Sequence, residues 1–159
     1  MAKIGEYRLR IYDLLYEKPI CEYAETRGNK KQSNVLILGT GWTGNEAFKA
    51  AFWAGQALDT ELNITVASQN ATAYKEQALS TKAGAYMPAL KIYAEQKHYA
   101  NLHFVDIDVE EGMDAAGLAP LDFAANRYNS VIISLGDAEY NWLAASELIT
   151  QISEAQTES

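Results

Sequence analysis

The chain has 159 residues, enough for one domain with a substantial hydrophobic core. Its 13 basic and 21 acidic residues give a net charge of −8, which argues against nucleic acid or an anionic membrane surface as the main partner. No apolar run approaches the roughly 20 residues that span a bilayer, so direct membrane insertion is not expected. The single cysteine, Cys21, excludes an internal disulfide and favours a reducing, cytoplasmic location.

Residues 1–33 are predicted to form an N-terminal helical leader followed by a loop. Apolar residues at helical spacing within residues 6–17 predict a helix, which Pro19 would end. Such a helix would pack on the domain or dock against another copy of the chain. Residues 24–33 are polar and contain Gly28, so they predict a loop.

A glycine-rich turn follows, in the sequence Gly39-Thr40-Gly41-Trp42-Thr43-Gly44. Residues 34–38 before it form an apolar run typical of a buried strand, and residues 45–58 after it are typical of a helix. Strand, G-x-G-x-x-G turn and helix, in that order, indicate a dinucleotide-binding fingerprint. Gly39 would allow the sharp turn, Gly41 the approach of a pyrophosphate, and Gly44 close packing of the helix on the sheet.

The rest of the chain alternates between predicted strands and helices. Strands are expected at 63–67, 102–106 and 130–135, and helices at 71–79, 88–96 and 138–152, with residues 59–62 extending the first helix and 107–128 mixed. This alternation predicts an α/β fold: a three-layer Rossmann-like domain over 34–152 with a parallel sheet in strand order 3-2-1-4. Residues 153–159 are predicted to be a polar, frayed tail.

Two segments resemble the TrkA-N (RCK) family, the Rossmann domains that regulate potassium transport and channels by binding nucleotides. The first is 35–44, which contains the glycine turn, and the second is 131–145, where Asp137 and Asn141 follow the predicted fourth strand. A weaker third match is 105–108, which contains Asp106, where the family places an acidic turn after the third strand, near the adenine. The resemblance implies a regulatory domain that binds NAD(H) or another adenine nucleotide, pairs as a homodimer, and serves a larger membrane-transport or multidomain assembly.

The chain departs from the dinucleotide-binding pattern at the end of the second strand. An acidic residue normally holds the ribose hydroxyls there, but this chain has Ser68-Gln69-Asn70. These side chains can still form hydrogen bonds with a ribose. Without a carboxylate a ribose phosphate is not repelled, which leaves NADP open, although Lys75 is the nearest cation.

The expected site lies at the carboxyl ends of the strands, where open α/β sheets bind ligands. Amides of residues 40–45 would hold the phosphates, and Ser68, Gln69 and Asn70 would lie near the ribose. Asp106 and Ile107 would lie near the adenine. The crevice would be closed by Ser134, Leu135 and Gly136, with Asn141 behind them. Trp42 would cover the phosphates or a ribose, or else be a surface or interface aromatic.

Structural alternatives accompany several of these residues. Asp106 is expected to be a rim residue of the adenine pocket, or else a helix cap or a solvated turn carboxylate. Asp137 and Asn141 are expected mainly to cap a helix. Tyr93 and Lys97 spell the Y-x-x-x-K pair of short-chain dehydrogenases, but they precede the third strand, so a catalytic role is rejected. The two histidines, His98 and His103, are expected at the surface, and no metal site is expected.

The sequence therefore favours a nucleotide-binding regulatory domain over an enzyme, because little chain remains to build a substrate-binding region. The first alternative is the cofactor-binding half of an NAD(P)-dependent oxidoreductase. The second is a degenerate Rossmann domain that binds only protein.

Overall fold

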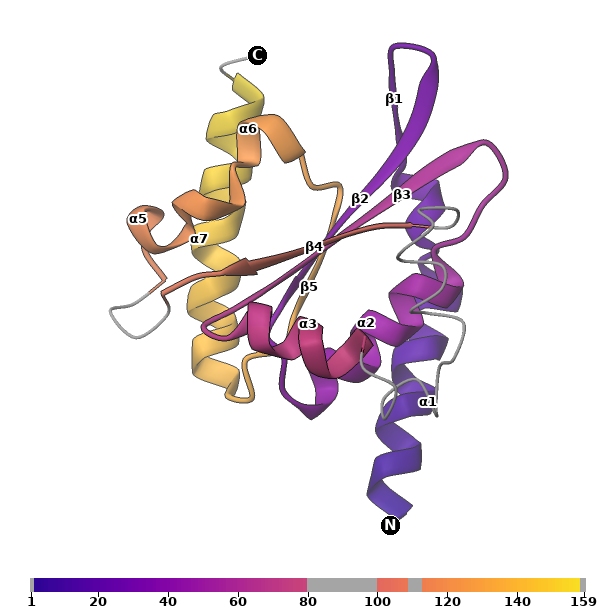
Figure 1. Ribbon diagram of the computed structural model, residues 1–159, viewed down its shortest axis with the longest axis vertical. Helices are drawn as coiled ribbons and strands as arrows, with labels where there is room; N and C mark the ends of the chain where they lie inside the picture. The colour runs from indigo at the N-terminus through magenta and orange to yellow at the C-terminus, as the bar shows by residue number, and fades with distance from the viewer. Residues whose placement is uncertain (1, 80–99, 109–112, 158–159) are drawn as a thin grey trace.

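The computed structural model describes residues 2–79, 100–108 and 113–157, and shows an α/β fold built on a mixed, open sheet of five strands (Figure 1). The strands are β1 (Glu25–Arg27), β2 (Lys30–Leu38), β3 (Thr60–Ser68), β4 (Asn101–Asp106) and β5 (Ser130–Ile133). The helices are α1 (Ala2–Glu17), α2 (Trp42–Ala54), α3 (Ala71–Leu79), α5 (Ala115–Leu118), α6 (Phe123–Asn126) and α7 (Ala138–Thr157). Short 3-10 turns occupy Ile20–Tyr23 and Ala119–Leu121.

The sheet is partly antiparallel, which corrects the expectation of a purely parallel one. β2 pairs in parallel with both β3 and β5, and β3 pairs in parallel with β4. β1 pairs with the beginning of β2 in the antiparallel sense, from Arg27 opposite Lys30 to Glu25 opposite Gln32. The predicted loop over 24–33 is therefore wrong, because a two-residue turn at Gly28 (φ 58°) closes a β-hairpin there.

Two hydrophobic cores lie on opposite faces of the sheet. Successive strand residues point to opposite faces, so Val35 and Ile37 pack with α1, α2 and α3, whereas Leu36 and Leu38 pack with the α5–α7 region. Figure 1 shows α7 and α6 on one side of the sheet and α1 and α2 on the other. The end of β2 is buried on both faces, which explains its continuous apolar run.

Several element boundaries differ from those expected. α2 ends at Ala54, with Gly55 as its C-cap, and β3 begins at Thr60, so residues 59–62 belong mainly to a strand and not to the helix. The sequence predicts a frayed tail from 153, but α7 continues to Thr157. The predicted helix over 88–96, Tyr93, Lys97 and His98 lie outside the described residues.

The N-terminal leader packs on the domain. Leu15 is buried and Ile11 packs against the same core, on the face that carries α2 and α3. Leu14 and Tyr16 are exposed on the other side of α1. The helix ends at Glu17, two residues before Pro19, as predicted. Within the described ranges, no helix is long and apolar enough to cross a membrane.

Candidate functional site

Two of the three glycines in the turn after β2 are required by the fold. Gly39 has φ 109°, and a Cβ at this position would collide with the backbone carbonyl of Ser134. A Cβ on Gly44 would collide in the same way with the carbonyl of Gly39. Glycine at 39 therefore lets the turn pass against the exit of β5, and glycine at 44 lets α2 pack closely on the turn.

Gly41 differs from the other two, because the fold makes no comparable demand for it. A Cβ built on Gly41 would meet no heavy atom within 4 Å beyond the adjoining residues, and its φ of −63° suits any residue. Gly41 is the N-cap of α2, which has no side-chain capping hydrogen bond. Within the described parts of the chain, the N–H groups of Trp42, Thr43 and Gly44 have no hydrogen-bond partner. These amides and the positive end of the helix dipole are therefore available to an anion.

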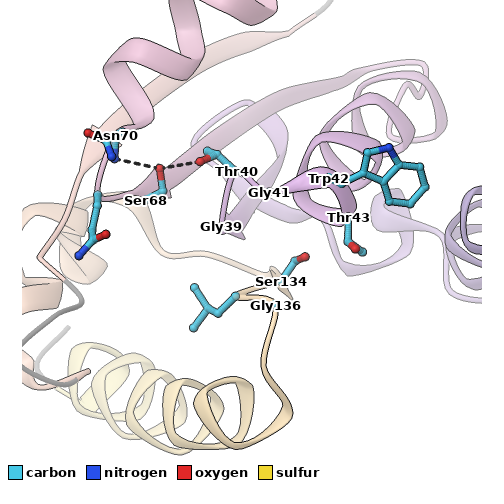
Figure 2. Close-up of a pocket in the computed structure, with 11 residues that line it drawn as sticks. Gly39, Thr40, Gly41, Trp42, Thr43, Ser68, Asn70, Ser134 and Gly136 are labelled. Atoms are coloured by element: carbon cyan, nitrogen blue, oxygen red, sulfur yellow. Dashed lines mark hydrogen bonds between the residues drawn. The ribbon is translucent and has the colours of Figure 1, made fainter. Parts of the chain in front are cut away.

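The uncapped helix end opens into a pocket of about 280 Å³ between the β2–α2 turn, the end of β3 and the exit of β5 (Figure 2). Eleven residues line it: Gly39, Thr40, Gly41, Trp42, Thr43, Ser68, Gln69, Asn70, Ser134, Leu135 and Gly136. All eleven are site residues expected from the sequence. The structure thus brings together three segments that are separated by about 30 and 60 residues in the chain.

Ser68 organises the corner of the pocket where the usual acidic residue is missing. Its Oγ accepts hydrogen bonds from the Thr40 hydroxyl (3.0 Å) and from the backbone N–H of Asn70 (3.3 Å), as Figure 2 shows. The Ser68 hydroxyl hydrogen is therefore left to donate elsewhere. Gln69 and Asn70 are exposed. Lys75 lies over the ring of Phe104, 6.0 Å from its centroid, and does not line the pocket.

Asp106 acts as a cap for α3. Its two carboxylate oxygens accept hydrogen bonds from the backbone N–H (2.9 Å) and the hydroxyl (2.7 Å) of Thr72, and these bonds lower the pKa of Asp106. Asp106 and Ile107 do not line the pocket at the start of α2. They line a neighbouring hollow of about 470 Å³, and Gln69 and Asn70 line both. The capping interpretation of Asp106 is therefore confirmed, and its position at the rim of an adenine pocket stays a prediction.

After β5 the capping interpretation holds for Asp137 but is wrong for Asn141, whose side chain bonds to the loop before α7. Asp137 Oδ1 accepts hydrogen bonds from the N–H groups of Glu139 (2.8 Å) and Tyr140 (3.1 Å) at the start of α7. Asn141 Oδ1 accepts a hydrogen bond from the Leu135 N–H (2.9 Å). Asn141 therefore fixes the loop that forms one wall of the pocket without lining the pocket itself.

A second hollow, which Trp42 helps to line, adds residues that the sequence did not indicate. Trp42 is 43% exposed, and its ring extends away from Ser68 and Asn70 (Figure 2) toward this hollow, of about 480 Å³, between α2 and α3. Tyr74 lines that hollow, donates a hydrogen bond to Asn45 Oδ1 (2.8 Å), and has a pKa raised by burial. Glu46 is buried there and pairs with Lys49 (2.8 Å). The i, i+3 spacing of Glu46 and Lys49 was the one feature of the sequence that could have predicted this ion pair.

Other chemistry-bearing residues form no second reactive cluster near the pocket. Among the described residues, no group of three or more His, Cys, Asp or Glu side chains is arranged to hold a metal ion. Cys21 is half-buried with a free thiol, and His103 is exposed, as expected.

Comparisons of the chain with protein-family models, with curated proteins and with solved structures found no match. Function therefore has to be inferred from the geometry and chemistry of the pocket.

Proposed function

We propose that this chain is a regulatory, Rossmann-type domain that binds an adenine nucleotide, NAD(H) or a mononucleotide, in the pocket at the start of α2. The observation that carries the proposal is Gly41. Ser, Thr, Asp or Asn at this N-cap would add a capping side chain; glycine is also common at N-caps but adds none, and neither sterics nor φ demands it here. A bare backbone at the mouth of an uncapped helix is what a closely approaching pyrophosphate needs.

The strand pairings support this reading. Because β2 pairs with β3 on one side and with β5 on the other, the parallel strands follow one another as β4, β3, β2, β5. In the order of the four predicted strands this corresponds to 3-2-1-4, the order that the proposed Rossmann-type fold requires. The direction of winding reverses between β2 and β5, and ligands of doubly wound folds bind in the crevice at such a reversal. The pocket lies at this point.

In the proposed complex the phosphates lie against the free N–H groups of residues 42–44. Local amides and the helix dipole would hold the phosphate charge, because the net charge of −8 offers no general attraction to an anion. The ribose would lie near Ser68, whose hydroxyl can donate. The adenine would extend toward the hollow beside Ile107.

The part of the pocket around Ser68, where the ribose would lie, is expected to discriminate weakly between nucleotides. Among the described residues, no carboxylate lines the pocket to hold a ribose diol, and no cation lines it to hold a ribose phosphate. We therefore expect NAD, NADP and adenine mononucleotides to bind with affinities within about tenfold of each other, a difference of ~1.4 kcal/mol.

A regulatory role is proposed because a ligand can act by binding two states of an assembly with different affinity, without any catalytic group. The proposal includes a TrkA-N-like role in a larger membrane-transport or multidomain assembly and a cytoplasmic location. It also includes a homodimer, and sedimentation velocity tests this oligomeric state. The rival proposal is the cofactor-binding half of an NAD(P)-dependent oxidoreductase. Preference for one reduced dinucleotide by more than about 100-fold would favour that rival over a sensor.

The sharpest test replaces Gly41 with a residue that the helix prefers. Gly41→Asp supplies a capping carboxylate, so the thermal stability of the free protein should stay equal or rise. The same carboxylate occupies and repels the proposed phosphate position. Thermal unfolding is measured with NAD, NADH, NADP, NADPH, ATP, ADP and AMP. A ligand at about 100 times its dissociation constant should add ~2.7 kcal/mol to the wild type and nothing to the variant.

Gly28→Asp is the matched control. It adds the same charge in the β1–β2 turn at φ 58°, a conformation that Asp tolerates, away from the pocket. This variant should respond to nucleotides as the wild type does. If no nucleotide stabilises the wild type, or if Gly41→Asp keeps the full response, nucleotide binding at this site is wrong and the protein-binding alternative is favoured.

A further inference from the structure

A second polar cavity, of about 170 Å³, lies on the α5–α7 face of the sheet, toward the opposite end of β2 from the glycine turn. Gln32 and Asn34 on β2, Asn63 and Thr65 on β3, and His103 on β4 line it from the sheet. From Asn34 to Gly39 the chain advances five strand residues, about 16 Å, so this cavity is separate from the proposed nucleotide pocket. Both its position and its polar character are unexplained by the proposed function.

An asparagine ladder makes the floor of this cavity rigid. Asn34, Asn63 and Asn101 lie opposite one another on three neighbouring strands. Asn63 Nδ2 donates a hydrogen bond to Asn34 Oδ1 (2.7 Å), and Asn101 Nδ2 donates one to Asn63 Oδ1 (2.8 Å). Asn34 Nδ2 donates in turn to the carbonyl of Asn126, next to the cavity wall formed by α6 (2.9 Å). Polar residues on a sheet face that could have been apolar, and that satisfy one another, indicate a built polar site.

Arg27 lies in the wall of this cavity with part of its guanidinium unpaired. Its Nε and Nη2 atoms are covered by protein and have no hydrogen-bond partner among the described residues. The remaining nitrogen, Nη1, makes only a long contact of 3.5 Å to the Ala125 carbonyl. Burying unpaired N–H groups of a cation is costly, so this arrangement is unfavourable unless a partner is supplied.

The two unpaired nitrogens of Arg27 are also the pair that grips an oxyanion. Nε–H and Nη2–H form one edge of the guanidinium fork, which matches two oxygens of a carboxylate or phosphate. In the present rotamer this edge is covered, so a rotation of the side chain at the end of β1 is needed to turn it into the cavity. Arg27 is the last residue of β1, directly before the Gly28 turn.

We infer that the cavity beside Arg27 is a second ligand site, which takes a small oxyanion, a carboxylate or phosphate, on the Nε–Nη2 edge of Arg27. The Gln32 amide and the His103 imidazole, which have no partner among the described residues, supply further hydrogen-bond donors. A volume of about 170 Å³ holds an anion of a few heavy atoms but not a nucleotide.

The charges around the cavity permit this occupant. No Asp or Glu lines it within the part of the chain that the structure describes. Two carboxylates lie opposite Gln32 in the sheet, that of the exposed Glu25 on β1 and that of Glu61 on β3. Glu61 is engaged by Lys30 (3.5 Å) and by the side chain of Asn101 (2.8 Å). On α6, Asp122 accepts a hydrogen bond from the N–H of Ala125 (3.1 Å). Among the described lining residues, the cation of Arg27 is therefore the charge that faces an anion inside the cavity.

The test is an NMR titration of the full chain labelled with nitrogen-15, following the Arg Nε–H signals. Acetate and inorganic phosphate are added separately as sodium salts, with ionic strength held constant by sodium chloride. We expect the Arg27 Nε–H signal to shift saturably with at least one of the two anions, half-saturating in the millimolar range. If acetate half-saturates the shift at the lower concentration, the ligand is a carboxylate; if phosphate does, the ligand is a phosphate.

Arg27→Lys keeps the charge but removes the fork, and Arg127→Lys makes the same change at an exposed arginine nearby. Because Arg27→Lys has no Nε–H, binding to the variants is followed through the backbone amides of residues 32–34. The half-saturation concentration should rise at least tenfold in Arg27→Lys and stay unchanged in Arg127→Lys. Absence of saturable shifts with both anions, or equal titrations of the wild type and Arg27→Lys, overturns the inference. Amide spectra of the free variants show that both are folded.

Discussion

At the scale of the single residue, the three glycines of the β2–α2 turn are glycine for different physical reasons. Gly39 and Gly44 are fixed by backbone contacts, because any Cβ there would collide with a carbonyl group. Gly41 has open space and an ordinary φ. A sequence motif gives all three the same weight. The structure separates the two that serve folding from the one that is left for a ligand.

This separation predicts opposite behaviour for two alanine substitutions. Gly39→Ala should lower the free energy of unfolding by more than about 3 kcal/mol, since it combines φ 109° with a clash against the backbone of Ser134. Gly41→Ala should cost less than about 1 kcal/mol. Urea unfolding followed by circular dichroism measures both. Equal effects of the two substitutions would show that the turn is not built as described.

Helix ends are the features that matter at the scale of the element. α3 and α7 receive capping carboxylates, from Asp106 and Asp137 respectively, whereas α2 begins at Gly41 without any capping side chain. The exception falls at the helix that faces the pocket. Asp106 also links β4 to α3, because the residue that it holds, Thr72, comes from the helix next to that strand in space.

Asp106 gives a prediction for the dependence of stability on pH. Hydrogen bonds from Thr72 lower its pKa in the folded state, so its contribution to stability is present above the unfolded pKa of about 3.9 and is lost as pH falls through the folded pKa. In Asp106→Asn the free energy of unfolding should therefore fall less steeply below about pH 4 than in the wild type. Chemical unfolding at several pH values measures this slope.

Thr72→Val provides the companion to that measurement. It removes the hydroxyl donor and keeps both the Asp106 carboxylate and the backbone N–H of residue 72. Its slope should lie between those of the wild type and Asp106→Asn. If all three proteins lose stability identically in acid, the link between Asp106 and Thr72 is not formed in solution.

At the scale of the whole molecule, the two hydrophobic cores on the faces of the sheet connect the N-terminal helix α1 to the other elements. Through Leu15 and Ile11, α1 belongs to the same core as the buried residues of β2 and α2. The opposite core joins β2 to α7, near the other end of the chain. Because β2 contributes to both cores, we expect the described parts to unfold together and not the leader by itself.

Leu15→Ala tests this cooperativity. Leu15 is 7% exposed, so its truncation should cost about 2–4 kcal/mol of the free energy of unfolding of the whole domain. Leu14→Ala, at a neighbouring residue that is 52% exposed, should cost less than about 0.5 kcal/mol. Urea unfolding should show one transition in each protein. An unchanged midpoint for Leu15→Ala would mean that α1 is not part of the core.

Local sequence patterns were enough to predict the elements whose apolar residues recur with a clear period. The apolar run before Gly39, the position of α3 and the end of α1 before Pro19 follow from residues close together in the chain. The eleven residues that line the pocket were also expected, because parallel strands of an alternating α/β chain end at the same edge of the sheet. What they bind stays a prediction.

Only the tertiary structure decided the features that depend on contacts between distant residues. The β1–β2 hairpin is polar and reads as a loop until it is paired, and residues 60–62 become a strand because β2 lies beside them. The asparagine ladder and the unpaired Arg27 arise from four strands brought together by the fold. Hydrophobic periodicity records which side chains are buried, whereas polar partners across a sheet leave no period in the sequence, so chain folding alone defines them.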